Sequence, residues 1–111
     1  MLQKINRLQK SKEIEWVLSQ GKGFKEDSLA LKTAKNNLNY SRFAFLVSKK
    51  VSLKASLRNK IKRGLRERVR LSLGKIRIGA DNVIVAIPGV EKEDSKTRER
   101  ALDKLLEKIS K

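Results

Sequence analysis

One segment of the chain, Leu53–Leu73, combines the apolar spacing of an α-helix with a high density of positive charge. On a helical wheel of about 100° per residue, one arc is apolar and comprises Leu57, Ile61, Gly64, Leu65 and Val69. The opposite side is cationic and comprises Asn59, Lys60, Lys62, Arg63, Arg66 and Arg70, with Arg58 at the border and Glu67 as its one acid. A helix of this kind has to bury its apolar arc against a core, so we expect it to dock on a sheet with its cations outward.

The positive charge of the chain is concentrated in and around this helix. Residues 49–77 hold 12 basic residues against one acidic residue, which is +11 of the total formal net charge of +16. Like charges such as Lys62 and Arg66 lie four residues apart, where each pair costs roughly a few tenths of a kcal/mol. Counterion release on a polyphosphate would offset that cost, so the block indicates a nucleic-acid-binding surface. The alternative interpretation is a solvated helix face that happens to be basic.

Composition excludes several classes of site. The chain has no Cys and no His, which excludes disulfides, thiolate zinc sites, His-ligated metals and both Cys–His and Ser–His–Asp catalysis. No apolar run approaches the roughly 18 residues of a transmembrane helix. The N-terminus lacks the continuous apolar stretch of a secretory signal. We therefore expect a cytoplasmic protein with no membrane contact.

The rest of the pattern predicts a single domain over residues 1–111 with one helix before the sheet. A short helix is predicted over residues 11–20, with Ser11 as its N-cap and Gly21 as its stop. Residues 21–23 are predicted to form a loop. One face of this helix is apolar through Ile14, Val17 and Leu18, and Trp16 lies off that face.

Strands are predicted over residues 28–34 and 42–48. In each segment, successive side chains would lie on opposite faces of a sheet, and one of the two faces is mainly apolar. These two strands are expected to form an antiparallel hairpin across a turn at residues 36–39. The apolar run at residues 83–87 is typical of a central strand covered on both faces. A further short strand is a weaker expectation at residues 49–51.

A last helix, capped by Asp94 or Ser95, carries an apolar stripe comprising Ala101, Leu102, Leu105, Leu106 and Ile109. Phe43 and Phe45 are expected in the core and not on a stacking platform. The fold class is therefore α+β: a small two-layer α/β sandwich with about four strands and three helices.

The basic segment also resembles a known family. Ser48-Lys49-Lys50, then Arg58-Asn59-Lys60-Ile61-Lys62-Arg63, then Leu65-Arg66-Glu67 closely resemble the signature of the bacterial ribonuclease P protein subunit. Asn6-Arg7-Leu8 is similar to the family's N-terminal stretch. The resemblance implies an unusual left-handed βαβ crossover, which the pattern of residues could not have indicated.

The resemblance also implies a function. The family's protein binds a large catalytic RNA, and the complex removes the 5′ leader of precursor tRNA by hydrolysing one phosphodiester bond. The active site belongs to the RNA, which holds the Mg²⁺ ions, while the protein binds the leader and strengthens metal binding. We therefore expect no catalytic residue, no protein metal site and no obligate protein partner.

Site residues follow from the resemblance position by position. The RNA-binding set comprises Lys49, Lys50, Arg58, Asn59, Lys60, Lys62, Arg63, Arg66 and Arg70. Lys60 stands where the family usually has Arg, so its contact loses the bidentate fork of a guanidinium. The leader cleft comprises Ile14, Leu18, Ala30 and Lys32. Family members often place aromatics on the first helix and first strand, and the alternative is that Ile14 and Leu18 only pack on the sheet.

Three other functions share some of these features. A ribosomal or ribosome-assembly protein has similar size and charge but places its charge more in tails and loops. A membrane-surface helix would need the apolar arc that the core requires. A free-standing nuclease would need paired carboxylates, whereas the acids here are scattered and the group Glu91, Glu93 and Asp94 is typical of a solvated loop before a helix.

Overall fold

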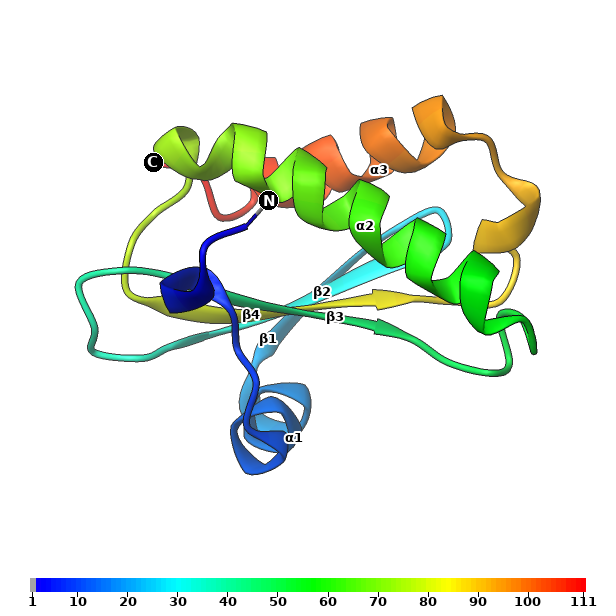
Figure 1. Cartoon of the computed structure of the whole chain (residues 1–111). Coiled ribbons are helices and arrows are strands. Elements are labelled where there is room, and N and C mark those ends of the chain that lie inside the picture. The colour runs from blue at the N-terminus through cyan, green and yellow to red at the C-terminus, as the bar shows by residue number, and fades with distance from the viewer. Residues whose placement is uncertain (1) are drawn as a thin grey trace.

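The structure is a computed structural model that describes residues 2–111, and it places a four-stranded mixed sheet between helices (Figure 1). The helices are α1 Ser11–Gln20, α2 Ala55–Ser72 and α3 Ser95–Glu107. The strands are β1 Lys22–Glu26, β2 Leu29–Lys35, β3 Arg42–Val47 and β4 Ala80–Ala86. Short 3-10 turns occupy Lys4–Asn6, Leu73–Lys75 and Val90–Lys92. The fold class, the three helices and the central position of β4 are confirmed.

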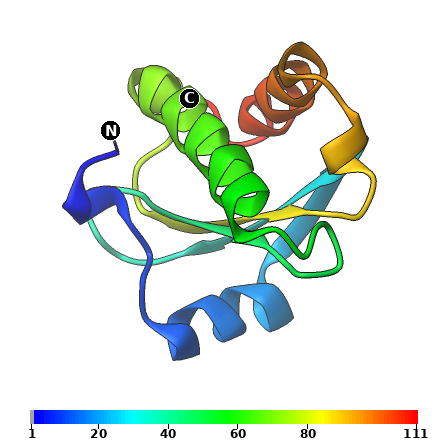
Figure 2. The same ribbon diagram turned by 45° about the vertical axis from the view of Figure 1, so that its right-hand side comes forward.

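The main core lies between the sheet and the pair α2 and α3, which lie side by side on one face (Figures 1 and 2). Ile61, Leu65 and Val69 are buried beneath α2, as their helical spacing predicts. From α3, the predicted stripe of Ala101, Leu102, Leu105 and Leu106 is buried, and Ile109 just beyond the helix is buried with it. Phe43 and Phe45 lie in this core, 1% and 8% exposed. The opposite face of the sheet is covered in part by α1.

Gly64 does not belong to the buried arc of α2. It is exposed, and a Cβ built on it would have nothing within 4 Å. The arc is narrower than the wheel indicates, because α2 touches the sheet through Ile61, Leu65 and Val69 while Gly64 faces the gap toward α3. No backbone among residues 2–111 requires a glycine at this position.

The predicted hairpin between the second and third strands is wrong. β4 lies between them, antiparallel to β2 and parallel to β3, in the order β1-β2-β4-β3. β4 carries the apolar run Val83, Ile84 and Val85, and five of its seven residues are buried, so it gains from neighbours on both sides. The local turn at residues 36–39 therefore joins two strands that are not paired with each other.

The unit β3–α2–β4 is a crossover between parallel neighbours. In Figures 1 and 2, α2 lies over β3, and β4 lies behind β3 while both strands run the same way. Seen from the α2 side with both strands pointing up, β4 is thus to the left of β3. The crossover is left-handed, as the family resemblance implies and against the general rule.

Several local predictions need correction at the ends of elements. Residues 21–23 are not a loop, because β1 begins at Lys22 and pairs with β2 along its whole length. Residues 49–51 form a turn and no strand. Ser11 is the first residue of α1, and the N-cap is Lys10 without a side-chain hydrogen bond. The cap of α3 is Asp94, whose carboxylate accepts from the Thr97 amide at 2.8 Å.

The glycine after α1 is required by close approach. The Gly21 amide donates to the Val17 carbonyl at 2.7 Å, and a Cβ at this position would lie 2.5 Å from that oxygen. A side chain here would collide with the last turn of α1 and crowd Thr33 of β2, whose carbonyl would lie 3.0 Å from the Cβ. Among residues 2–111, no helix has the length and apolarity needed to cross a bilayer.

Candidate nucleic-acid interface

The side of α2 that faces away from the core carries cations that the rest of the protein leaves unpaired. Asn59 and Arg63 are exposed, and Lys62 is partly exposed. Within residues 2–111, the side chains of these three residues make no hydrogen bond or ion pair. The positive charges of Lys62 and Arg63 are therefore directed at solvent and available to a polyanion.

The turn before α2 adds two more cations to the same end of the molecule. Lys49 and Lys50 are exposed in a turn closed by a 3.0 Å bond from the Val51 amide to the Ser48 carbonyl. The turn lies beside the first residues of α2 (Figure 1). Arg58 donates to the Ser52 carbonyl at 2.8 Å, which fixes this guanidinium against the turn while its charge stays uncompensated by any acid. Lys49, Lys50 and Arg58 thus lie together at the N-terminal end of α2.

Two arginines of α2 are neutralised by carboxylates. Arg70 Nε donates to Glu67 Oε1 at 3.0 Å, and this hydrogen bond lowers the pKa of Glu67 and raises the pKa of Arg70. Arg68 binds Asp103 of α3 through two bonds of 2.9 and 2.6 Å, which lower the pKa of Asp103. Arg68 therefore fastens α2 to α3, and Arg70 contributes less charge to the surface than the sequence indicates.

Lys60 is separated from the other motif cations. It lines a small hollow between α2 and α3 that also contains Gly64, Ser95 and Glu99. Arg63 and Arg66 lie on the other side of α2, beside the N-terminal segment. The structure thus brings Arg63 and Arg66 together and places Lys60 around the helix from them.

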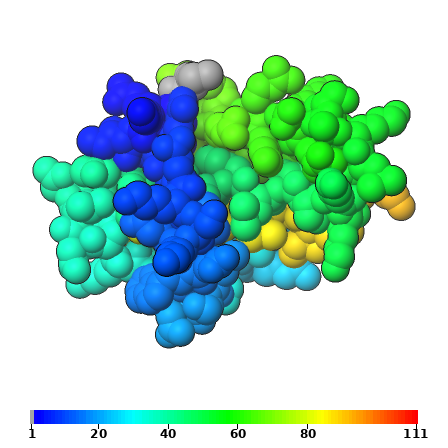
Figure 3. All heavy atoms as spheres, turned by 60° about the horizontal axis from the view of Figure 1, so that its bottom comes forward, coloured from blue at the N-terminus to red at the C-terminus, as the bar shows by residue number. Residues whose placement is uncertain are grey.

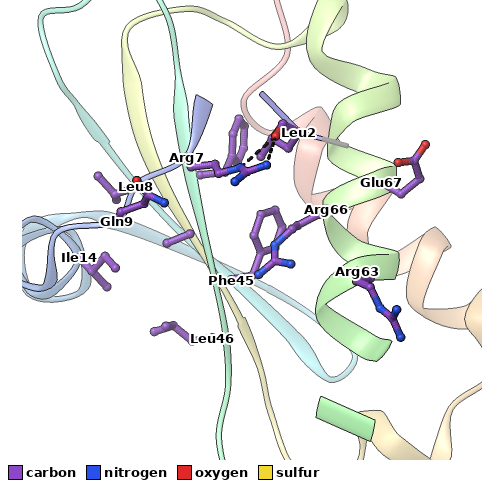
Figure 4. A pocket seen from close by; sticks show the side chains of 12 residues that line it. Leu2, Arg7, Leu8, Gln9, Ile14, Phe45, Leu46, Arg63, Arg66 and Glu67 are labelled. Atoms are coloured by element: carbon purple, nitrogen blue, oxygen red, sulfur yellow. Dashed lines mark hydrogen bonds between the residues drawn. The ribbon is translucent and has the colours of Figure 1, made fainter. Parts of the chain in front are cut away.

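A groove of about 570 Å³ lies between α2, β3 and the N-terminal segment (Figure 4). Its apolar lining includes Phe45, Leu46 and Ile14, and Arg63 and Arg66 border it on the α2 side. The Arg66 guanidinium lies 6.0 Å from the centroid of the Phe45 ring, close enough for a cation–π contact. The groove therefore combines an apolar lining with cations along one side.

The N-terminal segment closes one end of this groove. Arg7 donates to the Leu2 carbonyl through Nε at 3.0 Å and Nη2 at 2.8 Å, and Leu2 is fully buried. The Leu8 amide donates to the Phe43 carbonyl at 2.8 Å, which attaches the segment to the free edge of β3. Sequence reasoning missed these residues as part of the site, because contacts between the chain start and β3 carry no local signal.

The four cleft residues lie on the α1 side of the sheet, which Figure 3 shows with α1 in blue and atoms of β4 in yellow beside it. Ala30 is opposite Val85 and Lys32 is opposite Val83 in the β2–β4 register. Ile14 and Leu18 are half-buried against the sheet. The packing of Ile14 and Leu18 on the sheet is confirmed, and their role in a leader cleft stays a prediction. Ile14 also lines the groove, so the groove and the cleft candidates are continuous.

Among residues 2–111 no group of three Asp or Glu side chains is close enough to hold a metal ion. Glu13, Asp81, Glu67 and Asp103 are each bonded to an arginine.

Comparison with known proteins agrees with this architecture. The family model described as Ribonuclease P matches residues 2–110. A ribonuclease P protein component of Clostridium botulinum strain 657 is 40% identical over 106 residues, covering 95% of each chain. One from Alkaliphilus metalliredigens is 34% identical over 108 residues, covering 97% of this chain and 96% of the relative.

Solved structures of RNase P proteins have the same fold as this chain. The RNase P protein of Thermotoga maritima in complex with 1-(4-fluorophenyl)-2-thiourea superposes with a TM-score of 0.86 at 31% identity, covering 93% of this chain and 99% of the other. The RNase P protein of Staphylococcus aureus shares the fold with a TM-score of 0.85 at 24% identity, covering 92% and 93%. The chain belongs to the ribonuclease P protein family, whose members are protein components of an endoribonuclease in tRNA processing.

Proposed function

We propose that this chain binds the catalytic RNA of ribonuclease P and the 5′ leader of precursor tRNA, and so assists Mg²⁺-dependent removal of the leader. The observation that carries the proposal is that Lys62 and Arg63 of α2 have no acidic partner among residues 2–111 and lie next to a groove with an apolar lining. A duplex surface alone would not need that lining. Single-stranded RNA uses both features, because its phosphates seek cations and its bases seek apolar or aromatic contact.

The exposed cations act first by binding phosphates. Lys49, Lys50, Lys62 and Arg63 have no acidic partner in the described part of the chain, so counterion release drives association. Arg63 offers a planar fork for bidentate phosphate contact, and Asn59 adds one donor group and one acceptor to the same turn of helix. These contacts fix the orientation of the protein on the catalytic RNA.

The groove and the α1 side of the sheet then hold the leader. Arg66 is held over Phe45 beside the groove, and Ile14 continues its apolar lining toward α1. Leu18 and Ala30 extend this surface, and Lys32 supplies charge along β2. Aliphatic contacts replace the aromatic stacking that the family often has there, so we expect weak discrimination among leader bases.

The chemistry belongs to the RNA partner. When bound to the catalytic RNA, Mg²⁺ activates the attacking water and stabilises the leaving oxygen. The protein contributes cations that lower phosphate repulsion and so favour close approach of leader, catalytic RNA and metal. No carboxylate set among residues 2–111 supports a metal-dependent nuclease in the protein itself.

Reconstitution with a bacterial ribonuclease P RNA tests the proposal. The protein should raise turnover of a precursor with a leader of several nucleotides more than that of a precursor with a single-nucleotide leader. Arg63→Ala should reduce the gain, whereas Arg100→Ala, an exposed arginine on α3, should leave it unchanged. No protein-dependent gain would refute the proposal and favour a ribosomal or ribosome-assembly role. Cleavage by RNA-free protein would also refute it.

A further inference from the structure

The exposed indole of Trp16 lies beside a hollow that the leader surface does not include. Trp16 is 53% exposed, while Val17 next to it is 1% exposed. The indole lines a hollow of about 310 Å³ together with Lys12, Glu13, Asn36, Arg42 and Asp81. Arg42 and Asp81 are the first residues paired between β3 and β4, whereas Leu46, which lines the groove, pairs with Val85 near the other end of these strands.

The floor of the hollow is held in place by an ion-pair network. Arg42 donates to Asp81 through Nε at 2.8 Å and Nη2 at 2.7 Å, and to Glu13 Oε2 at 3.1 Å. Asn36 Nδ2 donates to Asp81 Oδ1 at 2.9 Å. The bonds to Asp81 and Glu13 raise the pKa of Arg42, so its guanidinium stays charged. The site is therefore built before any ligand arrives.

The network leaves one acceptor available. Glu13 Oε1 accepts no hydrogen bond within residues 2–111, and the Glu13 side chain is 36% exposed. Lys12, one helical turn before Trp16, makes no ion pair there either. The hollow thus offers an aromatic face, a carboxylate oxygen and an ammonium group.

We propose that this hollow binds one unpaired RNA base that carries an exocyclic amino group. The base stacks on Trp16, its amino group donates to Glu13, and Lys12 contacts the adjoining phosphate. Carboxylates accept from amino groups such as cytosine N4, whereas uracil offers a carbonyl there. This inference rests on the proposed function, because it assigns a further contact to the same RNA partners.

Size and charge favour a base over the other occupants of such a surface. The volume lies at the lower end of the range for small-molecule sites, roughly 300–1,000 Å³, which suits one planar ring system and is too small for a packed helix. The hollow is lined by two cations, Lys12 and Arg42, and two acids, Glu13 and Asp81. Arg42 is bonded to both acids, so Lys12 is left to pair with the phosphate of a nucleotide whose ring is neutral, and the net charge of +16 draws RNA to the protein.

Trp16 is the only tryptophan of the chain, so its fluorescence reports on this hollow. The first experiment titrates the full-length protein with hexacytidine and hexauridine, which have equal length and charge. We expect hexacytidine to quench the emission at several-fold lower concentration. Equal quenching by both oligonucleotides would overturn the assignment of Glu13. No quenching by either oligonucleotide would overturn the whole site.

Variants then separate stacking from base recognition, with labelled oligonucleotides and fluorescence anisotropy as the readout. Trp16→Ala should weaken hexacytidine binding about tenfold, and Trp16→Phe should restore part of it. Glu13→Gln should reduce the preference for cytosine and leave quenching in place, because Arg42 keeps both bonds to Asp81. Leu71→Ala, which removes an exposed apolar side chain on α2, is the matched control and should bind like the wild type. Unchanged affinity in Trp16→Ala would refute the site.

Titrations of the same Trp16 emission with larger RNAs identify which RNA supplies the base. Quenching by the catalytic RNA alone would assign it to that RNA, and quenching only by precursor with a leader would assign it to the substrate. A protein that raises turnover in reconstitution while Trp16→Ala binds normally would overturn this inference and leave the proposed function standing. Failure of reconstitution would reject the proposed function separately.

Discussion

Replacing Glu67 with glutamine should strengthen RNA binding. Glu67 is the one acid on the cationic side of α2, and it neutralises Arg70 through a hydrogen bond of 3.0 Å. The lowered pKa of Glu67 shows that the carboxylate is charged at all pH values near neutrality. A glutamine of similar shape removes the negative charge, so Arg70 becomes free to contact a phosphate.

The size of the effect follows from counterion release. Each additional phosphate contact steepens the plot of log K against log salt by roughly 0.7 for single strands to 0.9 for duplexes. If the added contact contributes nothing at about 1 M salt, the steeper slope gives roughly a five- to eightfold gain in affinity at about 0.1 M salt. The wild type, with about 6–8 phosphates contacted, should have a slope of order −5.

The assay is anisotropy or filter binding with ribonuclease P RNA across a salt series at fixed Mg²⁺. Glu107→Gln on α3 is the matched control, because it changes the net charge equally at an exposed position away from the cationic side of α2. Only Glu67→Gln should steepen the slope. An unchanged slope in Glu67→Gln, or an equal change in both variants, would refute the claim that local charge on α2 contacts phosphate.

Three further predictions concern stability and the motif. Gly64→Ala should raise the free energy of unfolding by about 1 kcal/mol in urea denaturation, because nothing lies within 4 Å of the new Cβ and Ala favours helix; a loss of stability would contradict this. Ile61→Ala should lower it by about 2–5 kcal/mol, since Ile61 is 2% exposed, and the salt slope of RNA binding should stay the same. Asp103→Asn should make the free energy of unfolding fall less steeply at acidic pH. The pKa of Asp103 lies below its ordinary 3.8 in the folded protein, because Arg68 donates hydrogen bonds to its carboxylate. The ion pair therefore stabilises the fold above pH 3.8, and this contribution is lost as the pH falls through the folded pKa. An equally steep fall in the two proteins would contradict that role.

The helices could be predicted because their signals are local. Buried residues of α2 and α3 recur with helical spacing, and Asp94 stands where a cap is needed. Strand pairing was harder, because the neighbours of β4 are set by contacts far apart in sequence. Leu31 pairs with Ile84, and Phe45 pairs with the same residue from the other side. No turn signal contains that information.

The edge strand β1 and the ion pairs between distant residues could not be predicted from the sequence either. β1 contains Gly23 and three charged residues, so its pattern is weak, and it exists because β2 offers a paired edge. Arg68 and Asp103 are 35 residues apart, and Arg42 and Asp81 are 39 apart. The pair Glu67 and Arg70 has a spacing of three on one helix, so it could have been inferred from sequence.

Lysine footprinting tests the central claim most directly. The protein, alone and bound to ribonuclease P RNA, is acetylated briefly and the modified lysines are quantified by mass spectrometry. If the cationic side of α2 and the turn before it bind RNA, Lys49, Lys50 and Lys62 become protected, while Lys104 and Lys108 in and after α3 remain reactive. Protection at Lys104 and Lys108 with full reactivity at Lys62 would contradict the account.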